Sequence, residues 1–219
     1  MAFAVKDCAL AAIATGVRAH NLRELRDNLL TVHPGSIYYH FWGGLLRPAF
    51  ENREYMNDFA SWSWKAHGLH DEALAERLSV IDPTDFEDLE ELRQELVEVT
   101  SDRLEESEKL RLLHADRPFM FIRSQIVIFD TYAAIEHPSR FPMAAPMMTP
   151  SSFFFHFIDA RSRTKDRVDD FREWLMEYGD EFRPLIDRLA SLDPYFIPLA
   201  ELKEKIVGIF AGYFAGETV

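Results

Sequence analysis

Shifted against itself by 116 residues, the sequence matches its own second half at a series of ordered positions. The pairs at this offset include Phe3 with Phe119, Thr15 with Thr131, Ser36 with Ser152, His40 with His156 and Arg47 with Arg163. After a four-residue gap the offset becomes 112, which pairs Asp58 with Asp170 and Trp62 with Trp174. Matches that stay in order across a few small gaps predict a tandem duplication.

The repeat sets the expected domain organisation. The two copies span residues 1–113 and 117–216, and the charged segment EESEKLRLLHADRP, which ends at Pro118, joins them. Two copies of one folding unit commonly pack about a pseudo-twofold axis, as the subunits of a homodimer do. We therefore expect both copies to form one globular body.

Each copy is predicted to open with β-structure and to continue as helices. The segment FMFIRSQIVIFDT (119–131) is rich in β-branched and aromatic residues, which predicts two short strands around Arg123–Gln125. Its counterpart FAVKDCALAAIATG (3–16) is rich in alanine and resembles a helix when taken alone, but the repeat favours a strand. Amphipathic helices follow, the first beginning at Asn21 with Glu24 three residues later. The predicted class is α+β, helix-dominated with short antiparallel hairpins, and all-α is the alternative.

Charge and cysteine content exclude several classes of function. The 24 basic and 37 acidic residues give a net charge of −13, which argues against binding to nucleic acid or to an anionic membrane surface. Cys8 is the single cysteine, so no intramolecular disulfide and no thiolate metal cluster can form. The sequence has no secretion signal and no apolar run near the ~20 residues that span a bilayer, which predicts a cytoplasmic protein.

The candidate site lies on the aromatic helix of each copy. In the first copy Ser36, His40, Gly43 and Arg47 fall on one helical face, and in the second copy that face carries Ser152, His156, Asp159 and Arg163. The remaining side chains of both helices are aromatic or aliphatic, so both helices should be buried. Ser36 is the expected N-cap of its helix. Because buried polar groups need partners, Asp58 and Asp170 are expected to bind the histidines.

Three interpretations of these residues stay open. Each His–Asp pair can be a structural hydrogen bond that fixes one helix to the next. His40, His156, Asp58 and Asp170 can instead meet at the pseudo-twofold axis and bind Zn, Fe or Mn. In the third, Arg47 and Arg163, with the Ser and His residues beside them, bind a small anionic ligand. A Ser–His–Asp hydrolase is disfavoured, since the sequence has no G-x-S-x-G motif.

These motifs resemble an uncharacterised family. Thr15–Gly16, the Ser36–His40 segment, Asp58–Trp62 and Leu74–Leu78 are similar to the bacterial and archaeal domain of unknown function numbered five-seven-five-two. The resemblance covers essentially the whole chain, but Thr131 of the second copy lacks the glycine that follows Thr15. It implies a context of carbohydrate and glycan metabolism and assigns no catalytic residues.

We therefore expect a non-catalytic module that binds a partner protein or a small anionic ligand and needs no cofactor. The alternative is a metal-dependent enzyme whose site lies where the two histidine-bearing helices meet. A third possibility is an architectural subunit in which Trp42, Trp64 or the Phe-rich helices form the interface of a homo-oligomer.

Overall fold

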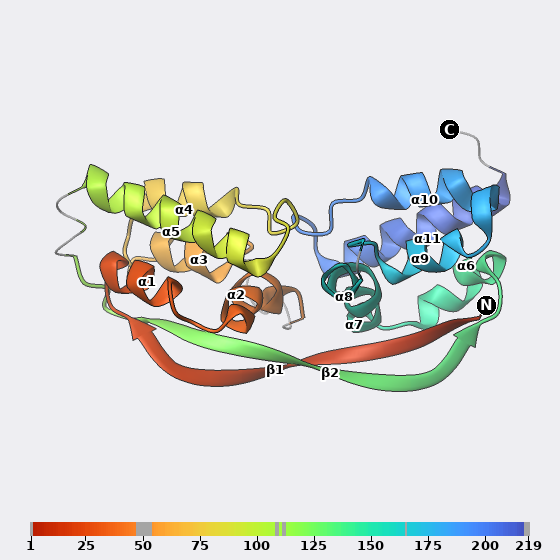
Figure 1. The fold of residues 1–219 in the computed structure, drawn as a ribbon, viewed down its shortest axis with the longest axis horizontal. Helices are drawn as coiled ribbons and strands as arrows, with labels where there is room; N and C mark the ends of the chain where they lie inside the picture. Colours follow the sequence, from red (N-terminus) through yellow and green to blue (C-terminus); the bar gives the residue numbers. More distant parts are fainter. Residues whose placement is uncertain (1, 47–53, 108–109, 111–112, 165, 217–219) are drawn as a thin grey trace. The chain divides into compact units, whose positions relative to one another are not determined.

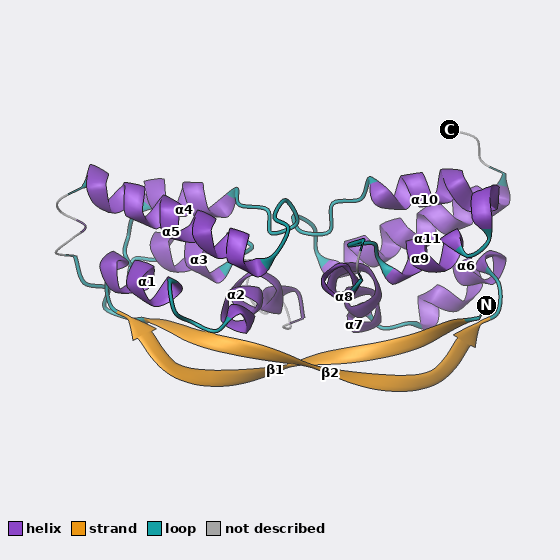
Figure 2. Cartoon of the chain, viewed as in Figure 1, coloured by secondary structure: helices purple, strands orange, loops and turns teal. Residues whose placement is uncertain are grey.

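The structure, a computed structural model, describes residues 2–46, 54–107, 110, 113–164 and 166–216. The α+β class is confirmed: helices dominate the chain and are joined by one antiparallel pair of strands (Figure 2). The chain divides into two compact units. Unit 1 comprises Met1–Ala9 and Ile126–Val219, and unit 2 comprises Leu10–Gln125.

The strands are longer than the sequence predicts. β1 (Phe3–Ala19) and β2 (Phe119–Ile135) are each 17 residues long, and they pair with each other in a two-stranded sheet. The predicted short hairpin within each copy is thus replaced by one continuous strand from each copy (Figure 1). The strand that the repeat favours for residues 3–16 is confirmed despite the helix propensity of alanine, because pairing with β2 overrides that weak local preference.

Both strands pass from one unit into the other. Residues 3–9 of β1 and 126–135 of β2 belong to unit 1, while residues 10–19 and 119–125 belong to unit 2. The compact units therefore differ from the copies 1–113 and 117–216 along the chain. The first residues of each predicted copy's strand pack with the helices of the other predicted copy.

Unit 2 holds the helices of the first copy, which lie on one side of its strand segments (Figure 1). Its helices are α1 (Leu22–Leu29), α2 (Pro34–Leu46), α3 (Asp58–Trp64), α4 (Glu72–Ser79) and α5 (Leu89–Glu106). The Phe119 ring of β2 stacks on Phe59 of α3 at a centroid distance of 5.0 Å and meets the edge of Trp62 at 5.7 Å. Phe121 is also fully buried, so β2 supplies part of this core.

Unit 1 holds the helices of the second copy, several of them short. They are η2 (Pro138–Arg140), α6 (Phe141–Ala144), η3 (Ala145–Met147), α7 (Pro150–Phe153), the π-helix η4 (Phe154–Asp159), α8 (Ala160–Arg163), α9 (Asp170–Met176), η5 (Gly179–Phe182), α10 (Arg183–Ala190) and α11 (Leu199–Ala215). The Phe3 ring of β1 lies 5.2 Å from Phe171 and 5.1 Å from Trp174, both on α9. No helix in the described part of the chain is long and apolar enough to cross a membrane.

Candidate functional site

In unit 2 the predicted polar residues bind the backbone of β2. The Ser36 hydroxyl donates a hydrogen bond to the Ile122 carbonyl at 2.8 Å, and the Ile122 N–H donates to His40 Nε2 at 3.1 Å. His40 Nδ1 lies 2.9 Å from Asp58 Oδ2, and the imidazole is 3% exposed. We call Ser36, His40, Asp58 and the Ile122 backbone the unit-2 clamp.

In unit 1 the corresponding residues bind the backbone of β1. The Ser152 hydroxyl donates to the Lys6 carbonyl at 2.6 Å, and the Lys6 N–H donates to His156 Nε2 at 2.9 Å. His156 Nδ1 lies 2.7 Å from Asp170 Oδ2. Ser152, His156, Asp170 and the Lys6 backbone are the unit-1 clamp. In both clamps a serine and a histidine bind the two polar backbone groups of a single strand residue.

The hydrogen-bond pattern assigns one tautomer to both rings. Because Nε2 accepts a backbone N–H, the proton of the neutral imidazole lies on Nδ1 and is donated to the aspartate. A metal ion needs a ring nitrogen with a free lone pair, and here the Nε2 lone pair is engaged by the strand. The arrangement can hold a strand and orient a ring, and metal binding would require breaking a backbone hydrogen bond.

Ser36 has a different role from the one predicted. Ser36 is not the N-cap of its helix, because α2 begins two residues earlier at Pro34. Its hydroxyl is therefore directed to the neighbouring strand rather than to the first turn of α2. Ser152 likewise lies inside α7, where Thr149 is the cap.

The residues predicted to form one metal site belong to different units. His40 and Asp58 lie in unit 2, and His156 and Asp170 lie in unit 1. Within the described ranges, no group of three or more His, Cys, Asp or Glu side chains is arranged to hold a metal ion.

Of the two predicted arginines, Arg163 is bound by carboxylates. Its Nε lies 2.8 Å from Asp159 and its Nη2 lies 3.1 Å from Asp170, while the guanidinium carbon is 4.0 Å from the centre of the Phe155 ring. Arg163 therefore supports the unit-1 clamp through its aspartate. Arg47, the predicted counterpart, lies outside the described residues.

A π-helical segment carrying His156 was not apparent from the sequence. Residues 154–159 form η4, and all six side chains are buried. In unit 2 the histidine of the clamp lies instead on the α-helix α2. π-Helical turns interrupt the ordinary helical register and are often found where a side chain has a specialised position. No local sequence signal distinguishes this segment from an α-helix.

A pocket of about 450 Å³ adjoins the unit-1 clamp. Its lining includes Lys6, Arg163, Asp170, Glu173, Trp174 and Glu177. Acidic groups outnumber basic ones among these, and Arg163 already binds Asp170. The pocket therefore lacks the excess of positive charge that recognition of a small anion favours.

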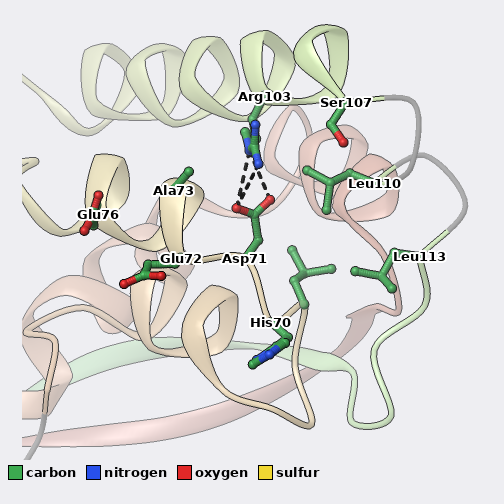
Figure 3. Close-up of a pocket in the computed structure, with 10 residues that line it drawn as sticks. His70, Asp71, Glu72, Ala73, Glu76, Arg103, Ser107, Leu110 and Leu113 are labelled. Atoms are coloured by element: carbon green, nitrogen blue, oxygen red, sulfur yellow. Dashed lines mark hydrogen bonds and ion pairs between the residues drawn. The ribbon is translucent and has the colours of Figure 1, made fainter.

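A second pocket, of about 520 Å³, lies in unit 2 between the start of α4 and the end of α5 (Figure 3). Asp71 caps α4 by accepting a hydrogen bond from the Leu74 N–H, and the Nε–H of Arg103 on α5 donates to Asp71 Oδ2 at 3.0 Å. Hydrogen bonding to the Asp71 carboxylate is the main cause that raises the pKa of Arg103. Glu72 and Glu76 also line the pocket, so it is acidic as well. The sequence carries no signal for the pairing of Asp71 with Arg103.

Cys8 is buried and its sulfur points toward a backbone carbonyl. Its Sγ lies 3.3 Å from the Ser151 oxygen, which accepts the thiol proton. Burial first, and then the carboxylates of Asp159 and Asp7, raise the pKa of Cys8 to about 12. Because the thiolate is the nucleophile, this thiol should be inert at neutral pH.

We expect native protein at neutral pH to react with Ellman's reagent at least about a hundredfold more slowly than the same protein in denaturant. The folded thiol stays protonated while the unfolded one has its ordinary pKa. Absorbance during the reaction measures both rates. Reaction of the native thiol as fast as the denatured one would contradict this description of Cys8.

Comparison with known proteins found one family model and one solved structure that are similar to the chain. The family model described as "Family of unknown function (DUF5752)" matches residues 1–211. The solved structure described as "The structure of OrfY from Thermoproteus tenax" is 27% identical, with a TM-score of 0.80, and the match covers 96% of this chain and 94% of that one. A search of curated proteins found no match.

Proposed function

The chain belongs to the DUF5752 family, a family of unknown function, and we propose that it is a non-catalytic interaction module whose partner is a protein. The observation that carries this proposal is the use of both nitrogens of His40 and of His156 in hydrogen bonds within the fold. The two histidines, which are the strongest candidates for catalysis or metal binding, therefore serve to stabilise the fold.

A protein partner is favoured over a small anion by the charges of the two pockets. Both are lined by more carboxylates than lysine and arginine side chains, and Arg163 is bound by two aspartates. With a net charge of −13, the chain would repel an anion at most of its surface. The proposal locates the module in the cytoplasm, where a lone thiol stays reduced.

We also propose that the chain arose by duplication of a unit of about 116 residues, the offset of the repeat. Ser152 and His156 lie 116 residues after Ser36 and His40, and the strand residue Ile122 lies 116 after Lys6. The same three hydrogen bonds recur in both clamps, which supports a common origin. An ancestor with one copy would have exchanged its first strand between two subunits, as the two copies here exchange theirs.

The alternative is a metal-dependent enzyme, and native mass spectrometry after incubation with Zn²⁺ or Mn²⁺ separates the two. We expect the mass of the folded protein to equal that of the denatured chain, and Asp170→Asn to leave this result unchanged. The Asp170→Asn variant keeps the His156 ring in place and so avoids the loss of a core side chain. A metal bound in whole-number stoichiometry by the wild type and lost in Asp170→Asn would overturn the non-catalytic assignment.

A further inference from the structure

Within unit 1, the end of β2 is exposed on both of its faces. The exposed fractions are 41% for Val127, 49% for Ile128 and 50% for Phe129. Since successive side chains of a strand point to opposite faces, apolar side chains reach solvent on both sides here. Residues 127–134 are all exposed, and we call Val127, Ile128, Phe129 and Tyr132 the β2 strip.

The outer edge of β2 in unit 1 has no neighbouring strand. Here β1 lies between the helices and β2, because Lys6 of β1 binds His156 and Ser152 while the Val5 carbonyl accepts a hydrogen bond from the Thr131 hydroxyl of β2. In the part of the chain that the structure describes, the sheet has two strands. An open edge with apolar side chains is a template for a further strand.

Tyr132 is held in a backbone conformation that its residue type disfavours. Its φ is 57°, and the residue is 93% exposed. The position 116 residues earlier is Gly16, with φ 78°, where a side chain is absent. The Asp130 carboxylate accepts the Tyr132 N–H at 2.8 Å and helps to hold the bend. A bulky residue kept at a glycine-type position with its ring in solvent points to use of that ring in recognition.

The distribution of charge favours a second copy of the chain as the occupant of this edge. Residues 126–135 contain one charged residue, Asp130, in a chain of net charge −13. Two copies of the chain repel each other through most of their surfaces. The repulsion is smallest where the β2 strips of the two copies face each other. If two strips pair antiparallel about a twofold axis centred on Ile128, Asp130 of one copy lies opposite the apolar Ile126 of the other rather than opposite Asp130.

We propose that the β2 strip binds the same strip of a second copy, forming a four-stranded sheet in the order β1–β2–β2–β1 across a homodimer. This deepens the proposed function by naming the partner as the chain itself. In this register Phe129 of each copy lies opposite Val127 of the other and Tyr132 lies opposite Ser124, so that Phe129 supplies the central aromatic contact and Tyr132 a contact at the rim. The isologous arrangement closes on itself and so limits assembly to two copies.

Light scattering coupled to size-exclusion chromatography, repeated over a wide range of protein concentrations, tests the dimer. We expect a dimer that dissociates on dilution, and a Phe129→Asp variant whose dissociation constant is raised on the order of thirtyfold or more. Phe129 is exposed, so this variant should keep the fold. Met147→Asp, the same kind of change at a position of unit 1 that is 88% exposed, is the matched control and should dimerise like the wild type.

Tyr132→Gly gives a second, independent readout. In dilute solution, where the protein is monomeric, its Tm should rise because the strained backbone is relieved. At higher concentration its dimer should be weaker than that of the wild type. A wild-type monomer at every concentration, or equal dimerisation of Phe129→Asp and Met147→Asp, would overturn the dimer. Neither result bears on metal binding. Failure of the dimer proposal can therefore be distinguished from failure of the non-catalytic assignment.

Discussion

A fragment of residues 10–125 is expected to fold as a monomer, whereas the fragment 1–113, which contains the whole first copy, is not. The difference lies in β2, whose Phe119 and Phe121 are buried in unit 2 at 4% and 1% exposure. Loss of one buried phenylalanine side chain costs about 3–5 kcal/mol. Loss of two, together with the strand that pairs with β1, approaches the about 5–15 kcal/mol by which a whole domain is stable.

Circular dichroism during heating measures this difference. The 10–125 fragment should show helical signal and a cooperative transition, while monomeric 1–113 should show no cooperative transition. The full chain is the reference for the helical signal. A monomeric 1–113 fragment that melts as cooperatively as 10–125 would contradict the assignment of residues 119–125 to unit 2.

Replacement of either clamp histidine by alanine should lower the free energy of unfolding by about 3–5 kcal/mol. Each substitution removes the partner of a strand N–H and one of the interactions of an aspartate, and it removes a ring packed against aromatic side chains. The His156 ring lies 4.7 Å from the Phe3 ring, and the His40 ring lies 4.6 Å from that of Phe119. Urea denaturation followed by fluorescence measures the change.

His67→Ala is the matched control for these variants. His67 is only partly buried, and its substitution should change the free energy of unfolding by less than about 1 kcal/mol. Ser152→Ala removes the hydroxyl bound to the Lys6 carbonyl and should cost about 1–2 kcal/mol. Similar Tm values for His40→Ala and His67→Ala would count against a structural role for the clamp.

The repeat predicted much of the site, because it identified which polar residues occur twice on a buried helix. The pairings of His40 with Asp58 and of His156 with Asp170 follow from the need to satisfy buried polar groups, and the structure contains both. The strand residue that each serine and histidine bind was not predictable in this way. The serine and the histidine bind its backbone N–H and carbonyl, and nearly every residue of the chain has these same two groups.

The exchange of strand segments could not be predicted for a related reason. Phe3 and Phe119 occupy equivalent positions in the repeat. The sequence therefore does not indicate which of the two phenylalanines packs against which set of helices. The choice depends on the long-range pairing of β1 with β2, which local sequence does not encode. The bend at Tyr132, in contrast, had a visible signal in the Thr15–Gly16 motif, since a glycine after a threonine in a strand suggests a bulge.

Amide hydrogen exchange at Lys6 and Ile122 tests the role of the clamps most directly. Both N–H groups bind a histidine rather than a neighbouring strand. We predict that both amides are protected in the native protein, and that His156→Gln lowers the protection of Lys6 much more than that of Ile122. Exchange of both amides in the wild type at the rate of a solvent-exposed strand edge would contradict the account, because the histidines would then be free for other chemistry.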